Sequence, residues 1–433
     1  MKKAGRLTRT GGREATTRHI PPKLALSVSM PSTPAPRGWK WSALSDLARL
    51  ESGHTPSRNH PEYWGGDVPW ISISDARAHD GDRIDDTEEK TNELGLANSS
   101  ARLLPSNTVC LSRTASVGYV VVMGRPMATS QDFVNWICSE ELDYNFLKYL
   151  FIAEDEGLLR FASGSVHQTI YFPEVKAFHI CHPSLPEQQR IVGVLDEAFA
   201  GLATAQAHAE KNLQNARELF DSYLEAVFAQ RGEGWEEKTM EEVAASDCSL
   251  SYGIVQPGDE VVDGLPVVRP TDLTHTTIKL DGLKRIDPKC AESYQRTMLQ
   301  GGELLLCVRG STGVISKAAS ELKGANVTRG IVPIRLNPKL LCQDFGFHLL
   351  RAEPVQTQIK AKTYGAALMQ INIGDLRKIA VAFPPLNEQR AIATQLDTLA
   401  AETQRLTRIY EQKQAALAEL KKSLLHQAFS GDL

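Results

Sequence analysis

Two stretches of the chain, residues 185–230 and 386–430, carry apolar residues at intervals of three and four, which is the period of one helix face. Neither stretch contains a proline beyond its first turn, and Gly232 and Gly431 follow the two ends, where glycine commonly ends a helix. At 1.5 Å per residue, each helix is expected to be roughly 65 Å long. The pattern therefore predicts two long helices, each with an apolar stripe that needs a partner.

The apolar stripes predict that the two helices pack against each other. Because a whole globular unit separates them in the sequence, they can pair antiparallel, as a coiled coil with pseudo-twofold symmetry. The alternative, in which each helix packs only on its own globular unit, stays open. The predicted helix–helix packing residues are Ile191, Leu195, Leu202, Leu219 and Tyr223 in the first helix and Ile392, Leu396, Leu399, Leu406, Leu417, Leu420 and Leu424 in the second.

The chain is a tandem duplication. Leu-Pro-Glu-Gln at 185–188 recurs as Leu-Asn-Glu-Gln at 386–389, and the same offset holds without a gap for over forty residues. Upstream, Gly-Trp at 38–39 matches Gly-Trp at 234–235, and Arg113 matches Arg309. Short β-rich runs alternate with turns in both copies, which predicts an α+β fold of two mixed α/β units. The expected domains are a basic disordered extension (1–36), globular unit 1 (37–183), a first helical spacer (184–231), globular unit 2 (232–384) and a second helical spacer (385–433).

Composition places the 433-residue chain among soluble globular proteins, with 42% hydrophobic and 23% charged residues. No apolar run approaches the roughly 20 residues that a membrane span needs. The seven cysteines are odd in number and form no C-x-x-C pair, so neither a disulfide framework nor a zinc ribbon is indicated. Together with the lack of a secretory signal at the N-terminus, this favours the cytoplasm.

The charge is unevenly distributed along the chain. Residues 1–40 carry nine Lys or Arg against Glu14 alone, a net charge of +8, so that the remaining residues carry −12 within a total of −4. Nucleic-acid binding by the folded part must therefore come from local basic clusters or be shared with a partner. The extension at 1–36 is either a solvated tail, a segment that touches nucleic acid, or the product of a start assigned upstream of Met30.

No catalytic or metal-binding motif is present. Gly-Ser-Thr-Gly at 310–313 lacks the Lys-Ser/Thr that completes a phosphate-binding loop, and the histidines are dispersed. Pro-Glu-Val-Lys at 173–176 has a nuclease-like pairing of acid and lysine, but no acidic partner in a strand precedes it. We therefore expect neither a catalytic site, a metal nor a cofactor in this chain.

The order of two globular units, each followed by a long helix that opens with Leu-Pro-Glu-Gln-Gln-Arg or Leu-Asn-Glu-Gln-Arg, resembles the specificity subunits of type I restriction-modification systems. Ser-Gly-His-Thr-Pro at 52–56, Val-Pro-Trp-Ile at 68–71 and Leu-Pro-Val-Val-Arg at 265–269 are similar to the openings of their target recognition domains. The resemblance covers residues 37–433. The chain departs from it in its long N-terminal extension, in an altered glycine-rich turn at 113–118 and in the absence of Gly-x-Thr-Pro from unit 2.

The resemblance implies a subunit without chemistry of its own that reads a split sequence in double-stranded DNA, one half per target recognition domain. It implies two modification (methyltransferase) subunits, which methylate adenine with S-adenosylmethionine, and restriction subunits, which translocate and cleave DNA. The paired helices would set the gap between the half-sites. Two alternatives remain: a coiled-coil scaffold whose globular units bind proteins, and an orphan specificity subunit without a restriction partner.

Arginine is the side chain most often placed against guanine edges, and loops on a rigid frame commonly carry such residues. Each arginine in a turn-rich segment or at a strand end could instead form a surface salt bridge. The acidic stretch at 75–93 is expected to face away from DNA or toward a protein partner. The candidate DNA-binding residues are Arg58, Arg113, Arg269, Arg309 and Arg329.

Overall fold

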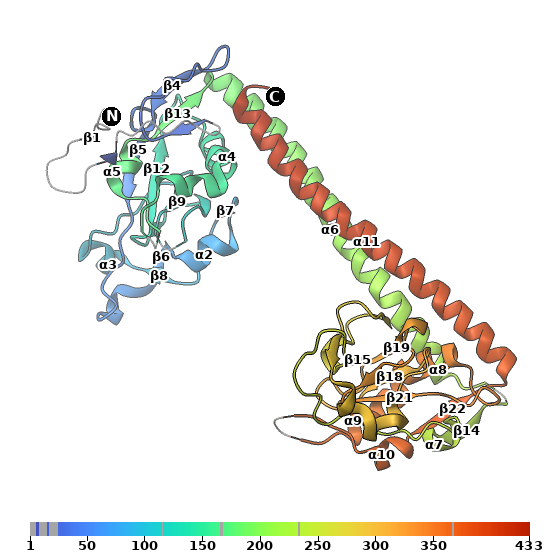
Figure 1. Ribbon diagram of the computed structural model, residues 1–433. Helices are drawn as coiled ribbons and strands as arrows, with labels where there is room; N and C mark the ends of the chain where they lie inside the picture. Colours follow the sequence, from blue (N-terminus) through green and yellow to red (C-terminus); the bar gives the residue numbers. More distant parts are fainter. Residues whose placement is uncertain are drawn as a thin grey trace. The chain divides into compact units, whose positions relative to one another are not determined.

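A computed structural model describes residues 6–7, 15–16, 25–114, 116–164, 168–232, 234–365 and 368–433. It divides into two compact units (Figure 1). Unit 1 comprises Met1–His208 and Lys413–Leu433, and unit 2 comprises Ala209–Gln412. The two long helices predicted from the sequence are confirmed as α6 (Leu185–Ala229) and α11 (Leu386–Ser430), each of 45 residues. Each helix contributes one part to unit 1 and the other part to unit 2.

The centre of unit 1 is a five-stranded sheet that separates two apolar clusters. Along β9, Val109 and Leu111 face the cluster formed with α4, whereas Cys110 faces the opposite cluster, as the two-residue period of a strand requires. The sheet order is β5 (Ala48–Ser52), β12 (Phe133–Cys138), β9 (Val109–Ser112), β10 (Val120–Met123) and β7 (Arg83–Ile84), with only the β10–β7 pair parallel. Helix α4 spans Tyr144–Glu154.

Smaller elements complete unit 1. One three-stranded sheet orders β11 (Ala128–Thr129), β6 (Trp64–Ile71) and β8 (Lys90–Thr91), and another orders β3 (Leu26–Ser27), β13 (His179–His182) and β4 (Lys40–Ala43). Strands β1 (Arg6–Leu7) and β2 (Ala15–Thr16) pair with each other. The short helices are α1 (Leu44–Leu47), η1 (Pro61–Tyr63), α2 (Ile73–Ala78), α3 (Glu93–Ala97), η2 (Asp155–Phe161) and α5 (Phe172–Lys176).

The expected disordered extension over 1–36 differs from the structure at its C-terminal end. Ala25, Leu26 and Val28 are fully buried in the core of unit 1, and β3 pairs with β13. The Leu26 N–H donates to the buried Glu154 carboxylate at 3.2 Å, and Arg160 donates to the Leu26 carbonyl at 3.0 Å. The apolar run Ala-Leu-Ser-Val thus has a defined place in a sheet. Apart from residues 6–7 and 15–16, the extension before residue 25 lies outside the described residues.

Unit 2 repeats this plan around a four-stranded sheet. Its order is β16 (Thr277–Ile278), β19 (Ile315–Ala318), β18 (Leu304–Cys307) and β21 (Ile331–Ile334). A second sheet has three strands in the order β17 (Lys284–Ile286), β15 (Leu265–Val268) and β20 (Asn326–Val327). A third sheet pairs β14 (Glu236–Thr239) with β22 (Ala380–Phe383). The helices are α7 (Met240–Val243), η3 (Pro270–Asp272), η4 (Pro288–Thr297), η5 (Ser320–Leu322), α8 (Gln343–Arg351), α9 (Glu353–Ala361) and α10 (Ile373–Arg377).

Within each unit, α6 and α11 run in opposite directions. In unit 1, the early α6 residue Leu195 shares a core with the late α11 residue Phe429. In unit 2, the late α6 residue Leu224 shares a core with the early α11 residue Leu396. Both clusters include residues of the globular parts, such as Phe146 of α4. The helices therefore pack on each other and on the globular units at the same time, which combines the two arrangements that the sequence left open.

The buried stripe of the helices is shifted by one residue, in places, from the predicted stripe. Leu219, Tyr223 and Leu420 are 50%, 37% and 47% exposed, whereas their neighbours Phe220 and Leu224 are buried. Ala209 and Phe220, both buried, are eleven residues apart, a spacing that follows a nearly straight helix better than a strict seven-residue repeat does. Of the other predicted packing residues, Ile191, Leu195 and Leu396 are buried, and Leu202, Ile392, Leu399, Leu406, Leu417 and Leu424 are half-buried.

The strand registers also correct the predicted match between Arg113 and Arg309. The turn after β9 is closed by a hydrogen bond from the Gly118 N–H to the Ser112 carbonyl, and the turn after β18 is closed in the same way by Gly313 and Cys307. The sequence match relied on the arginine itself, although its spacing to the glycine differs by one residue. The equivalent positions are Ser112 and Cys307, Arg113 and Val308, Thr114 and Arg309, and Gly118 and Gly313.

Candidate nucleic-acid interface

In the first turn of each long helix, a buried glutamine joins the helix to its globular unit. The Gln188 side chain accepts from the Asp143 N–H at 2.9 Å and donates to the Glu141 and Pro183 carbonyls. Gln389 makes the same three kinds of bond in unit 2, where it accepts from the Cys342 N–H at 2.9 Å. The repeated Glu-Gln motif is therefore a structural joint, because an unpaired buried amide would be costly.

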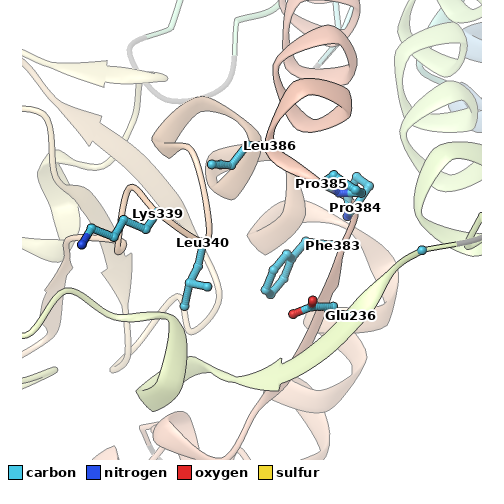
Figure 2. Close-up of a pocket in the computed structure, with 8 residues that line it drawn as sticks. Glu236, Lys339, Leu340, Phe383, Pro384, Pro385 and Leu386 are labelled. Atoms are coloured by element: carbon cyan, nitrogen blue, oxygen red, sulfur yellow. The ribbon is translucent and has the colours of Figure 1, made fainter.

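A pocket lies beside each of these joints. In unit 2 its volume is about 240 Å³, and Figure 2 shows Phe383, Pro384 and Leu386 at its wall beside Glu236 and Lys339. The equivalent pocket in unit 1, lined by Trp39, Lys40 and Pro183 among others, is about 350 Å³. Within the described ranges, no group of three His, Cys, Asp or Glu residues could hold a metal ion. None of the described helices is long and apolar enough to span a membrane.

An exposed turn occupies the same position in both units. In unit 1 it joins β11 to β12, and the Phe133 N–H donates to the Ser130 carbonyl across it. In unit 2 it joins β20 to β21, and the Ile331 N–H donates to the Thr328 carbonyl at 3.0 Å. Gln131 and Arg329 are exposed on these two turns. Arg329 was a predicted DNA-binding residue, whereas the residue type alone did not single out Gln131.

Both turns are held by a glycine in the preceding segment. A Cβ atom on Gly53 would lie 1.8 Å from the Ser130 carbonyl oxygen, and one on Gly253 would lie 2.0 Å from the Val327 carbonyl oxygen. Both distances are far below van der Waals contact, so only glycine permits the two segments to lie side by side. The glycine of the Ser-Gly-His-Thr-Pro motif thus fixes the turn that carries Gln131.

Positive charge gathers around the turn of unit 2. Arg329 makes no side-chain hydrogen bond or ion pair with any residue that the structure describes. Burial raises the pKa of Tyr252, and the charges of Arg329 and Arg309 oppose that rise. The Nε atom of Arg309 is buried, and no described residue accepts its hydrogen. This face of unit 2 is suited to an anionic partner.

A loop with exposed aromatic and apolar side chains lies beside this charge. Arg309 forms a β-bridge with Gln370, and Gln370 also bridges Tyr364. The Tyr364 ring is exposed, and its hydroxyl donates to Asn372 Oδ1 at 2.5 Å. Leu368 and the following methionine are exposed as well, whereas residues 366–367 lie outside the described residues. This loop therefore exposes aromatic and apolar surface next to Arg309.

Two of the predicted arginines are bound to carboxylates of their own unit. Arg58 makes a bidentate ion pair with Glu89 at 2.5 and 2.6 Å, and its guanidinium lies 4.0 Å from the centre of the Trp64 ring. The hydrogen bonds of this pair raise the pKa of Arg58 and lower the pKa of Glu89. Arg269 binds Asp272 through two nitrogens at 2.8 and 3.2 Å. Each of these guanidiniums has two of its five N–H groups engaged by a carboxylate, so fewer remain for DNA.

Arg113 supports the turn of unit 1 through a hydrogen bond to its backbone. Its Nη2 donates to the Gln131 carbonyl at 3.0 Å, and its guanidinium lies 4.9 Å from the centre of the Phe172 ring. Burial lowers the pKa of Arg113, and the charge of Asp132 opposes this effect. At the equivalent position, Val308 is fully buried in the core of unit 2. Arg113 therefore positions the turn that carries Gln131.

The acidic stretch at 75–93 is largely held by local contacts. Asp75 accepts the Ser72 N–H at 2.9 Å at the start of α2. Asp86 pairs with Lys90 at 2.8 Å and with Arg125 at 3.0 Å. These contacts neutralise part of the negative charge of this stretch, which was expected to face away from DNA or toward a protein partner.

Two copies of one mixed α/β unit, each with an exposed polar turn and each followed in the sequence by a long helix, define a duplicated protein whose equivalent turns carry different side chains. The family model for the type I restriction modification DNA specificity domain matches residues 36–213 and again residues 232–415. The chain belongs to this family and carries two copies of its domain.

Named relatives are type I specificity subunits. The MjaIX specificity subunit of Methanocaldococcus jannaschii is 33% identical over 162 residues, 37% of this chain and 38% of that protein. The EcoBI specificity subunit of Escherichia coli is 24% identical over 274 residues, 58% of this chain and 57% of that protein. The matches thus span less than two thirds of the length of these relatives.

Solved structures share the whole fold. A chain from a structure of complex assembly and conformational transition in a type I restriction-modification system matches with a TM-score of 0.69 at 21% identity, over 93% of this chain and all of that chain. The HsdS subunit of Thermoanaerobacter tengcongensis matches with a TM-score of 0.61 at 20% identity, over 93% and 99%. These likenesses establish the architecture of two mixed units and two long helices.

Proposed function

We propose that this chain is the DNA specificity subunit of a type I restriction-modification complex and reads a bipartite, asymmetric sequence. One observation carries the proposal: the same unit occurs twice, and the equivalent exposed turns carry Gln131 in one copy and Arg329 in the other. Two unlike readers on one chain recognise two unlike half-sites, whereas two identical readers would select a palindrome.

The long helices would separate the two readers. Each helix is 45 residues long, or roughly 65 Å at 1.5 Å per residue. Half-sites on one face of B-DNA recur about every 34–36 Å, a distance that helices of this length can span. In this proposal the antiparallel pair fixes the number of unread base pairs between the half-sites.

The chemistry would belong to partner subunits. Two modification subunits would methylate adenine with S-adenosylmethionine, and restriction subunits would translocate and cleave DNA, while this chain selects the sequence without catalysing a step. Shared phosphate contacts with the modification subunits would explain how a chain whose residues beyond position 40 carry −12 can bind DNA. Such a complex would work in the cytoplasm, where the DNA lies.

The proposal is tested by producing the full chain together with type I modification subunits from the same genome and mapping methylated adenines in the DNA of the producing cells. We expect one interrupted, asymmetric motif that disappears when this chain is omitted. Binding of the purified complex to that motif should weaken steeply with salt, as phosphate contacts require. Co-purification without any sequence-dependent methylation or binding would instead favour a protein-binding scaffold and would overturn the proposal.

A further inference from the structure

We propose that Gln131 and Arg329 occupy one equivalent base-reading position, so that unit 1 selects an adenine and unit 2 a guanine at corresponding places in the two half-sites. This inference rests on the proposed function and adds the identity of one base in each half-site. Glutamine pairs in a bidentate way with the N6 and N7 atoms of adenine, and arginine with the O6 and N7 atoms of guanine.

The equivalence of the two positions follows from strand register. In unit 1, Phe133 of β12 is paired with Ser112 at the end of β9. In unit 2, Ile331 of β21 is paired with Cys307 at the end of β18. Each exposed residue lies two positions before the paired residue of its strand, on a turn closed by the same backbone hydrogen bond. The equivalent turn residues are Ser130 and Thr328, Gln131 and Arg329, and Asp132 and Gly330.

The amide of Gln131 is held by a neighbouring side chain and keeps the groups that a bidentate contact needs. The Thr55 hydroxyl donates to its Oε1 atom, which uses one of the two lone pairs on that oxygen and leaves the other lone pair and both N–H groups available. The backbone on either side is fixed, since Arg113 donates to the Gln131 carbonyl and the Gly53 segment contacts the turn. A reader held in this way loses little conformational freedom when it binds.

The guanidinium of Arg329 differs from those of Arg58 and Arg269. These two arginines are engaged with Glu89 and Asp272, whereas no described carboxylate pairs with Arg329, so its five N–H donors are available to a ligand. The turn is anchored from behind, because the Arg329 N–H donates to the Ile254 carbonyl at 2.8 Å. A fixed backbone under a fork of donors without a described partner is the arrangement that suits a guanine edge.

The test exchanges the two side chains within the complex of this chain and its modification subunits. Arg329→Gln and Gln131→Arg are each compared with the natural chain by selecting bound sequences from randomised duplex DNA. We expect Arg329→Gln to replace a guanine preference by an adenine preference at one position of the second half-site, and Gln131→Arg to make the reverse change in the first. A bidentate contact worth about 1–3 kcal/mol corresponds to a discrimination of about 5- to 150-fold.

Lys323→Gln is the matched control, because it also removes one exposed positive charge from unit 2. Lys323 follows η5 at the end of the sheet where β18 begins, away from the turn at the other end. The control should leave both half-sites unchanged. Melting temperatures within 2–4 °C of the natural chain, a shift that corresponds to about 1 kcal/mol, would establish that each variant folds.

Two results would overturn the inference. If Arg329→Gln weakened binding to all sequences equally, the side chain would contact phosphate rather than a base. If the natural complex selected a bipartite sequence but both exchanges left it intact, the turn would not read bases, and the proposed function would still stand. A natural complex without any sequence preference would instead refute the proposed function itself.

Discussion

The imidazole Nε2 atom of His348 lies 2.7 Å from Oδ1 of Asp397, and this contact joins α8 to the start of α11 within unit 2. Unit 1 has Tyr149 and Asp196 at the equivalent positions, also joined by a hydrogen bond. His348 is 1% exposed, and its Nδ1 atom is buried without a described partner. At this equivalent contact, unit 2 thus uses a histidine, which can titrate in the physiological pH range, and unit 1 uses a tyrosine, which does not.

This histidine is expected to make unit 2 less stable in mild acid. Burial lowers the pKa of His348 below its usual 6.5, and Asp397 opposes this only in part. The unfolded chain therefore takes up a proton first as pH falls, so stability is lost below about pH 6.5 and levels off once the folded form is also protonated. Urea unfolding at pH 7 and pH 5 measures the loss.

His348→Tyr copies the joint of unit 1 and is expected to reduce this pH dependence. Because burial also lowers the pKa of His182 in unit 1, the variant should retain a smaller residual slope. If His348→Tyr and the natural chain lose the same free energy of unfolding between pH 7 and pH 5, the proton taken up belongs to another group.

A chain that starts at Met30 is expected to be less stable than one that starts at Ala25. The shorter chain loses Leu26 and Val28 from the core of unit 1, and burial of two such side chains contributes about 3–6 kcal/mol. It also leaves the buried Glu154 without the Leu26 N–H. Chemical denaturation of the two chains isolates residues 25–29, and equal midpoints would contradict the prediction.

Arg309→Ala is expected to weaken sequence-specific binding by about 1–3 kcal/mol and to relax one position of the second half-site. The Arg309 backbone lies beside Gly330, the residue that follows Arg329, so the substitution removes a positive charge next to that turn. Binding selection with the variant complex measures the effect, with Lys323→Gln as the control. An unchanged preference in the second half-site would remove Arg309 from the set of DNA contacts.

Seven residues inserted into α6 near Ala205–Ala209, with a matching insertion in α11 near Lys413, are expected to change the length of the unread spacer without changing either half-site. Two helical turns advance a helix by about 10 Å and almost restore the direction of its buried face. Methylation mapping of cells that produce the variant reads the spacer directly. The same spacer in both chains would contradict a measuring role for the helices.

The long helices were predictable because their evidence is local and repeated many times. Dozens of residues without an internal proline, apolar at intervals of three and four, define a helix regardless of its neighbours. Whether Leu219 or Phe220 is buried depends instead on residues that are distant in the sequence. Phe220 is selected because its ring packs at 6.1 Å from His348 and 5.1 Å from the Arg351 guanidinium, both on α8.

The candidate DNA contacts were less predictable for a related reason. Arginine is recognisable by residue type, but whether it is available depends on partners that are distant in sequence, such as Glu89 for Arg58. Gln131 carries no charge and lies outside the motifs that resemble the openings of target recognition domains. Its equivalence to Arg329 emerges only when β12 and β21 are paired with their neighbouring strands.

Residues near the end of α11 complete the core of unit 1, most of which comes from the first half of the sequence. Phe429 of the last helical turn lies 5.1 Å from Phe146 in the core of unit 1, and Arg190 donates to the carbonyl of the last residue, Leu433. The interior of unit 1 therefore stays open until residues 413–433 have been made and have reached it. Unit 1 without this segment of α11 would expose apolar core residues such as Phe146 and would be open to proteolysis.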